Sequence, residues 1–180
     1  MGHKKILVAP LDWGLGHATR CIPIIKALEK EQFEPVLAGD GSSFKLLRKE
    51  FPHLKHFQLP SYNIKYSKHP RFLKLKLAAQ APHLIKTISE ERRTADKLVT
   101  EENLSGIISD NRWGVFSEKV PSVFVTHQVN VLSGWSTYFS SKLQQKLIKN
   151  FDECWVPDSK GDQNLSGKMG HVPNFSFPTK

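Results

Sequence analysis

KKILVAPLDWGLGHATRCIPIIKAL, residues 4–28, joins an apolar run to a loop with two glycines and a histidine, and then to an amphipathic segment. The run at 4–10 is continuously apolar, which is typical of a strand buried on both faces of a parallel sheet. Apolar residues recur at helical spacing over 17–30, which predicts a helix there. The stretch therefore begins an α/β pattern of alternating strands and helices.

The same alternation recurs along the 180-residue chain. Further strands are predicted at 34–40, 54–60, 105–111, 121–128 and 152–158. Helices are predicted at 42–51 with Ser42 as N-cap, within 61–103 with a break near Pro82, near 112–119, and at 136–151. This order predicts a three-layer, doubly wound, mostly parallel Rossmann-like sheet over 1–165, followed over 166–180 by an irregular tail or the start of an interdomain linker. Such sheets bind ligands at the carboxyl ends of their strands.

The charge of the chain is uneven. Lys and Arg number 26 against 17 Asp and Glu, a formal net charge of +9. Residues 61–89 contain basic, aromatic and aliphatic side chains and no acidic one. Such a stretch suits contact with an anionic membrane surface or a phosphorylated ligand, although a solvent-exposed helix face can have the same composition. No nucleic-acid-binding motif is present, so nucleic acid is not an expected partner.

The two cysteines indicate a reducing compartment. Cys21 and Cys154 are far apart in the sequence and belong to no CxxC or Cys/His cluster, so we expect both to be buried and reduced. The apolar run near the start is too short for a signal peptide or a membrane span. These features predict a cytoplasmic protein, with 61–89 as the candidate for peripheral contact with the inner face of the membrane.

The glycine loop has three interpretations. Gly14-x-Gly16-x-x-Thr19, with Asp40 at the end of the second strand, is a partial dinucleotide fingerprint that lacks the third glycine. Alternatively, the dipole of the following helix holds His17 uncharged, so that its imidazole can accept a proton from a hydroxyl. The third interpretation is structural, with His17 only capping the helix.

The loop after the predicted strand at 121–128 favours the chemical interpretation of His17. It contains the polar group His127-Gln128-Val129-Asn130. Together with GLGHATR, this loop resembles the acceptor-side domain of GT-B glycosyltransferases. The resemblance is strongest to the branch of the N-acetylglucosaminyltransferase that makes lipid II. It extends over most of the chain in the order of elements and over these two loops in detail.

The resemblance implies an inverting glycosyltransferase in which His17 removes the proton of the acceptor hydroxyl. The sugar would come from a nucleotide-sugar donor, and the acceptor would be a hydroxyl compound such as a lipid-linked saccharide or glycolipid. The resemblance also implies a C-terminal domain, absent from this chain, that holds the donor, so we expect the chain to be an inactive truncated domain. The residues expected to bind substrate are Gly14, Gly16, Asp110, Asn111, Arg112, His127, Gln128 and Asn130.

Some features depart from the family or leave its details open. Asp12 and Trp13 stand where the family has more glycines, and SDNRWG at 109–114 does not match a glycine-rich loop of the family. Arg112 is expected to pair with an acceptor phosphate or with Asp110. The tryptophans Trp13, Trp113 and Trp135 fall in these loops and suit either stacking on sugar rings or core packing.

No metal or cofactor is expected for the transferase, because no DxD-type carboxylate pair follows a strand near the site. Two alternatives remain open at this point. One is an NAD(P)-binding Rossmann oxidoreductase domain, supported by the two glycines and Asp40. The other is a sugar-nucleotide epimerase of related fold.

Overall fold

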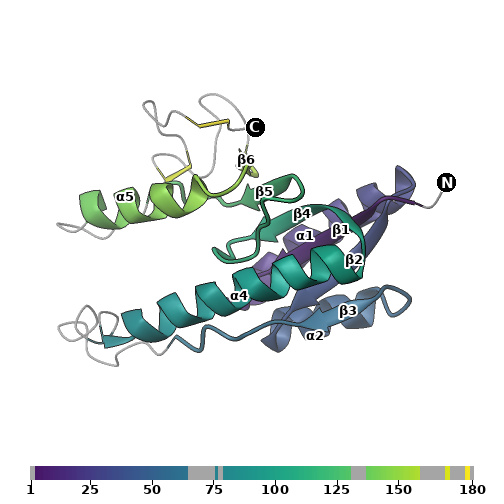
Figure 1. The fold of residues 1–180 in the computed structure, drawn as a ribbon, viewed down its shortest axis with the longest axis horizontal. Helices are drawn as coiled ribbons and strands as arrows, with labels where there is room; N and C mark the ends of the chain where they lie inside the picture. The colour runs from purple at the N-terminus through teal and green to yellow at the C-terminus, as the bar shows by residue number, and fades with distance from the viewer. Residues whose placement is uncertain are drawn as a thin grey trace.

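The computed structural model describes residues 3–64, 76, 79–130, 137–158, 169–170 and 177–178. Within these residues one parallel sheet of six strands runs in the order β3-β2-β1-β4-β5-β6 (Figure 1). The strands are β1 (Lys5–Pro10), β2 (Glu34–Gly39), β3 (His56–Gln58), β4 (Leu104–Asp110), β5 (Ser122–Val125) and β6 (Glu153–Trp155). The predicted doubly wound α/β fold is thereby confirmed, although β3 and β6 are shorter than expected.

Helices cover both faces of the sheet because its strands are apolar on both sides. The described helices are α1 (Leu15–Lys30), α2 (Gly41–Glu50), α4 (Ala81–Glu101) and α5 (Thr137–Ile148). Leu7 of β1 belongs to the buried cluster that includes Leu98 of α4, whereas the next residue, Val8, packs with Ile25 of α1. This alternation places α4 and α1 on opposite faces. The long helix α4 runs across the sheet in Figure 1.

One predicted feature of the central region is confirmed and another is wrong. The break near Pro82 is present: Ala79 is helical, Gln80 lies in a turn and is the N-cap of α4, and Pro82 lies in the first turn of α4. A proline is tolerated there because the first backbone N–H groups have no intrahelical partner. Residues 112–119 form turns and no helix. Their backbone is held by the neighbouring helix instead, since the Gly114 amide donates to Glu91 Oε2 at 3.1 Å. A Cβ on Gly114 would lie 2.2 Å from the Ile88 carbonyl oxygen, so this segment packs too closely on α4 for other residues.

The N-terminus of α2 is capped from a distant loop. The N-cap position is Asp40, and its side chain makes no capping hydrogen bond. The carboxylate of Asp12 instead accepts hydrogen bonds from the backbone amides of Ser42 and Ser43, at 2.9 and 3.0 Å, and from the Ser42 hydroxyl at 2.7 Å. Burial alone would raise the pKa of Asp12, but these hydrogen bonds outweigh it and lower the pKa. Ser42, the predicted N-cap, therefore donates hydrogen bonds to Asp12, the residue whose side chain caps the helix.

Gly41 is expected to be required for this cap. Its φ is +61°, and a Cβ there would lie 1.8 Å from Asp12 Oδ2. We expect Gly41→Ala to lower the free energy of unfolding by about 1–3 kcal/mol, through left-handed strain and displacement of the Asp12 carboxylate. Urea denaturation measures this change. Gly16→Ala is the control, because Gly16 lies within α1 with nothing within 4 Å of its Cβ position, and alanine favours helix there. A Gly41→Ala variant as stable as Gly16→Ala would contradict the prediction.

Other expectations are confirmed or fall outside the described residues. Cys21 and Cys154 are both buried and not disulfide-bonded, as predicted. Among the described residues, no helix combines the length and apolarity needed to cross a membrane. Most of the predicted tail at 166–180 is not described, and neither is Trp135, so the domain boundary stays a prediction.

Candidate active site at the carboxyl ends of the strands

A cavity of about 370 Å³ lies where the strand order reverses, at the carboxyl ends of β1, β4 and β5. Ligands of doubly wound sheets bind in this crevice because the loops after neighbouring strands diverge there to opposite faces. Four of the predicted site residues line the cavity, together with two tryptophans, a leucine and a glutamine from α5. The lining residues are Leu11, Trp13, His17, Asn111, Trp113, His127, Gln128 and Gln144.

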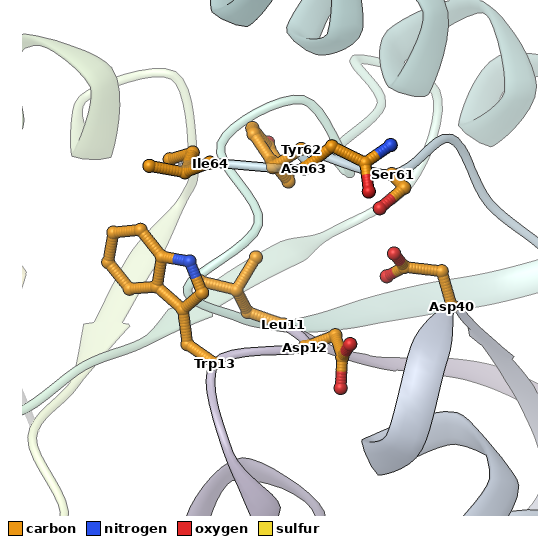
Figure 2. Close-up of a pocket in the computed structure, with 8 residues that line it drawn as sticks. All are labelled: Leu11, Asp12, Trp13, Asp40, Ser61, Tyr62, Asn63 and Ile64. Atoms are coloured by element: carbon orange, nitrogen blue, oxygen red, sulfur yellow. The ribbon is translucent and has the colours of Figure 1, made fainter. Parts of the chain in front are cut away.

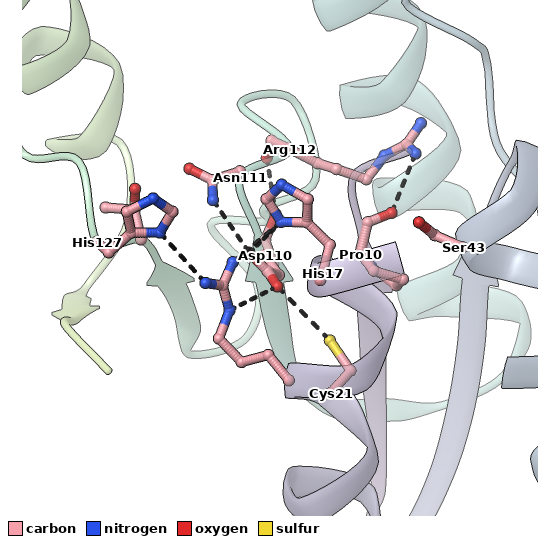
Figure 3. A network of polar contacts seen from close by, with 12 residues as sticks. Pro10, His17, Cys21, Ser43, Asp110, Asn111, Arg112 and His127 are labelled. Atoms are coloured by element: carbon pink, nitrogen blue, oxygen red, sulfur yellow. Dashed lines mark hydrogen bonds and ion pairs between the residues drawn. The ribbon is translucent and has the colours of Figure 1, made fainter. Parts of the chain in front are cut away.

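His17 is the third residue of α1, in the turn that follows the glycine loop. Gly14 is the N-cap, with φ of +87° and no side-chain capping bond, so the capping interpretation of His17 is wrong. The imidazole Nδ1 instead lies 3.0 Å from Asp110 Oδ1 (Figure 3). Nε2 of His17 has no hydrogen-bond partner. Among the described residues, every buried side-chain nitrogen or oxygen does have such a partner, so Nε2 is not buried. Because His17 lines the cavity, Nε2 is accessible from it.

Asp110 lies behind His17 and does not line the cavity, which corrects its predicted role as a pocket residue. It ends β4 and is fully buried, with its carboxylate turned toward α1. Arg20 donates to it twice, from Nε to Oδ2 at 3.0 Å and from Nη2 to Oδ1 at 2.6 Å. Asn111 Nδ2 also donates to Oδ1, at 3.1 Å. Because a buried carboxylate needs such donors, Arg20 and Asn111 stabilise Asp110 beside Nδ1 of His17.

Sequence reasoning missed Arg20 entirely. The signal was available, because Arg20 follows His17 by three positions in a predicted helix and so shares its face. Arg20 Nη1 also lies 3.2 Å from Nδ1 of His127, which enters the cavity from the loop after β5. Burial lowers the pKa of His127, and the positive charge of Arg20 lowers it further.

The structure corrects the prediction for Arg112. Its side chain is fully buried on the α4 side of the sheet, away from the cavity. Nε donates to Glu91 Oε1 at 2.7 Å, and Nη1 donates to Asp40 Oδ1 at 2.6 Å. It also donates to the carbonyl oxygens of Pro10 and Pro60, at 3.3 and 2.6 Å. A guanidinium has five donors and no acceptor, so Arg112 ties the end of β1 and the loops after β2 and β3 to α4.

Asn111 separates two charged neighbours that point to opposite faces. Its φ is +58°, a left-handed conformation that asparagine tolerates better than most residues. The carboxylate of Asp110 therefore meets α1, whereas the guanidinium of Arg112 meets α4. Predicted pairing between these two side chains is not observed.

The buried cluster around Arg112 also contains a tyrosine. The Tyr62 hydroxyl donates to Glu91 Oε2. Burial raises the pKa of Tyr62 well above its usual range, and the negative charge of Glu91 adds to this. Burial likewise raises the pKa of Glu91, although Arg112 acts in the opposite direction. Tyr62 packs edge-on against Trp113 at a ring-centroid distance of 5.8 Å, so the cluster supports a wall of the cavity.

Three other predicted residues lie elsewhere. Gly14 and Gly16 form the turn into α1 but do not line the cavity. Asn130 is tied to its neighbours, since its amide N–H donates to the Met169 carbonyl and its side-chain oxygen accepts from Gln145 Nε2 at 3.2 Å. These bonds fix the loop after β5, and the predicted contact of Asn130 with substrate stays a prediction.

A second, polar cavity of about 220 Å³ bears on the dinucleotide interpretation (Figure 2). It lies beside the ends of β1 and β2, between Asp12, Asp40 and the segment 61–64. A dinucleotide site would use Asp40 to accept hydrogen bonds from ribose hydroxyls. Here Asp40 is buried and paired with Arg112, and Asp12 caps α2. Both carboxylates already have partners, which argues against a nicotinamide cofactor at this position.

A third cavity, of about 300 Å³, adjoins the one at His17 and is almost wholly apolar. The two share Trp13, Trp113 and Gln144. The other residues that line it come from the segment after β3 and from α4 and α5: Tyr62, Ile64, Gln80, His83, Leu84, Ser140, Leu143 and Leu147.

The predicted membrane contact of 61–89 stays a prediction. Residues 65–75 and 77–78 lie outside the described part of the chain, and with them most of the basic side chains in that stretch. Of the two basic residues described, Lys76 is exposed, and Lys86 lies 3.7 Å from Glu90 on α4.

Neither protein-family models nor curated proteins match the sequence. Solved structures match its fold. A putative UDP-N-acetylglucosamine 2-epimerase from Listeria monocytogenes matches 88% of this chain with TM-score 0.56 and 13% identity. MurG from Acinetobacter baumannii matches 88% with TM-score 0.50 and 10% identity. A glycosyltransferase from Rickettsia africae matches 88% with TM-score 0.53 and 13% identity.

The chain spans about 40% of the length of these proteins: 40%, 42% and 38%, respectively. At such identities the likeness concerns the fold alone. The predicted GT-B resemblance is confirmed at that level, with a match consistent with one Rossmann-like domain of a two-domain architecture. The same fold occurs in transferases and in epimerases, so the choice between them depends on the site.

Proposed function

We propose that this chain is the acceptor-binding domain of an inverting glycosyltransferase, with His17 as the catalytic base. The observation that carries the proposal is the pair formed by His17 and Asp110 at the cavity. Nδ1 faces a buried carboxylate at 3.0 Å, and Nε2 is left accessible. A hydrogen on Nδ1 leaves the lone pair on Nε2 free to accept a proton, as a general base requires.

In the proposed reaction, the acceptor hydroxyl enters the cavity with its oxygen beside His17 Nε2. The bond from this oxygen to the anomeric carbon forms as the bond from that carbon to the diphosphate breaks, which inverts the carbon. The hydroxyl proton moves to Nε2, and the nucleoside diphosphate leaves with the electron pair of the broken bond. Asn111 and Gln128 line the same cavity and supply amide groups suited to binding further hydroxyls.

The donor is proposed to be a nucleotide sugar held mainly by a second domain of the full protein. The names of the solved neighbours include a UDP-N-acetylglucosamine 2-epimerase, so UDP-N-acetylglucosamine is the first donor to test. The full protein is incubated with this donor and a panel of hydroxyl acceptors, and the products are identified by mass spectrometry and NMR. A glycoside with an inverted anomeric centre supports the proposal. Acceptor-independent formation of the C2 epimer of the sugar would support the epimerase instead.

The acceptor is proposed to carry an apolar group next to its hydroxyl. The apolar cavity shares a wall with the cavity at His17, so one ligand can occupy both. Its volume of about 300 Å³ is at the lower end of the range for small-molecule sites, about 300–1,000 Å³. This supports a lipid-linked or similarly amphipathic acceptor over a free saccharide.

Leu143 provides a test, because it lines the apolar cavity while remaining 58% exposed. We expect the chain to bind hexyl glucoside more tightly than glucose, with Leu143→Gln weakening this binding by about three- to tenfold through lost apolar contact. Quenching of tryptophan fluorescence measures the affinity below the micelle concentration. The matched control is Ile85→Gln, since Ile85 is 67% exposed on α4 but does not line the cavity. Equal effects of the two substitutions would contradict the assignment.

A further inference from the structure

Arg20 contacts three side chains at the site, Asp110, His17 and His127, and the proposed reaction gives no role to Arg20 or to His127. Besides its two hydrogen bonds to Asp110, its Nη2 lies 2.9 Å from Nδ1 of His17, and its Nη1 lies 3.2 Å from Nδ1 of His127. Its side chain is 20% exposed and that of Asp110 is 1% exposed, so the ion pair is largely shielded from water. One guanidinium therefore contacts both imidazoles of the site.

The contact with His127 determines the form of that ring. A guanidinium stays protonated and can only donate, so a hydrogen bond from Nη1 to Nδ1 requires a lone pair on Nδ1. His127 must then be uncharged and carry its hydrogen on Nε2. The lowering of its pKa by burial and by the charge of Arg20 agrees with this geometry.

The environment of His17 is different, because its Nδ1 faces a donor and an acceptor at similar distances. Asp110 Oδ1 lies 3.0 Å away and accepts only, whereas Arg20 Nη2 lies 2.9 Å away and donates only. A hydrogen on Nδ1 satisfies Asp110 and leaves Nε2 free as a base. A hydrogen on Nε2 satisfies Arg20 and removes the base from the cavity. Protonation of both nitrogens would place a second positive charge beside the guanidinium.

We propose that Arg20 is a positioning residue that keeps the imidazole of His127 uncharged with its hydrogen on Nε2, and that holds Asp110 so that His17 carries its hydrogen on Nδ1. The inference rests on the proposed function only in giving His17 a role as base. Arg20 donates to both oxygens of Asp110, and Asp110 Oδ1 lies 3.0 Å from His17 Nδ1, where it can accept a hydrogen. With the hydrogen on Nδ1, the lone pair of Nε2 remains accessible from the cavity.

The other groups around the two rings do not replace the charge of Arg20. Asn111 donates a neutral amide to Asp110, and the Cys21 thiol lies 3.8 Å from Asp110 Oδ2. Burial raises the pKa of Cys21 well above its usual range, and Asp110 acts in the same direction, so the thiol stays protonated. Among the described groups in contact with the two imidazoles, Arg20 is thus the cation and Asp110 the anion.

The test uses the 180-residue chain without substrate. Nitrogen-15 NMR of the histidine side chains reports both the tautomer and the protonation of each ring as pH is varied. In the unaltered chain, we expect His127 to carry its hydrogen on Nε2. In Arg20→Gln, His127 is expected to take up a proton at higher pH, with a roughly tenfold larger ratio of protonated to neutral His127 at pH 7. Protonation becomes easier because the substitution removes a positive charge from beside the ring and leaves the negative charge of Asp110 without its cation.

Two further variants separate charge from geometry. Arg20→Lys keeps the charge but lacks the planar fork, so we expect little change in the protonation of His127 and loss of its single tautomer. Lys26→Gln removes a positive charge from the exposed part of the same helix and is expected to change neither ring. Backbone amide spectra report whether each variant is folded.

Two results would overturn the inference. One is His127 of the unaltered chain carrying its hydrogen on Nδ1, which needs no variant to observe. The other is unchanged titration of His127 in a folded Arg20→Gln variant. Neither measurement depends on sugar transfer, so failure of the proposed reaction and failure of this inference are distinguished.

Discussion

Replacing His17 with glutamine is expected to lower the turnover of the full protein by about 100- to 10,000-fold, the contribution typical of a general base. Glutamine can still donate to Asp110, so the pocket keeps its shape, but its amide cannot accept a proton from the acceptor. Donor affinity is expected to remain nearly unchanged, because the proposed donor site lies in another domain. Steady-state kinetics and donor titration measure the two quantities.

The matched control for this experiment is His53→Gln. His53 is also hydrogen-bonded to a carboxylate, at 2.7 Å from Glu29, but its side chain is 61% exposed on the surface and far from the cavity. The His53→Gln substitution is expected to leave turnover unchanged. If His17→Gln retained turnover within tenfold of the unaltered protein, His17 would not be the base and its role would be structural.

The largest expected effect on stability comes from Arg112→Met. This substitution leaves the carboxylates of Glu91 and Asp40 buried without their cation, and removes donors from two carbonyl oxygens. Breaking such a buried ion pair costs about 3–5 kcal/mol, against a total stability of about 5–15 kcal/mol for a typical domain. We expect the midpoint of urea denaturation to fall accordingly. A loss below 1 kcal/mol would contradict the assigned network.

A second set of variants tests whether uncompensated charge is the cause. Adding Glu91→Gln and Asp40→Asn to Arg112→Met removes the two buried negative charges along with the positive one. Because the single substitution is harmful mainly through the charges it leaves unpaired, the triple variant is expected to be more stable than Arg112→Met alone. A triple variant whose loss equals the sum of the three single losses would point to packing as the cause.

Much of the fold could be predicted because its signals are local. A continuously apolar run of strand length indicates a strand buried on both faces, and each such run of the sequence proved to be a strand of the parallel sheet. The errors occurred where distant contacts replace local ones. Residues 112–119 have no helix because Gly114 bonds to Glu91 of another helix, and α2 is capped by Asp12 from the loop after β1.

Local signals also predicted part of the candidate site. His17, His127 and Gln128 follow strand ends, and parallel strands bring those ends to one edge, so their meeting at one cavity could be expected. Arg112 was misassigned because a sequence does not show to which face a side chain turns. The left-handed Asn111 sends it to α4, where its partners lie 21 and 72 positions away.

By itself, the sequence determined the order of strands and helices and which polar residues follow each strand, because hydrophobic periodicity and turn residues act over a few neighbours. Only the tertiary structure decided which charges are paired. Asp110 and Arg20 are 90 positions apart, and their ion pair exists because α1 packs on the end of β4. In a shielded environment each charge must meet a partner, and packing selects that partner across the whole chain.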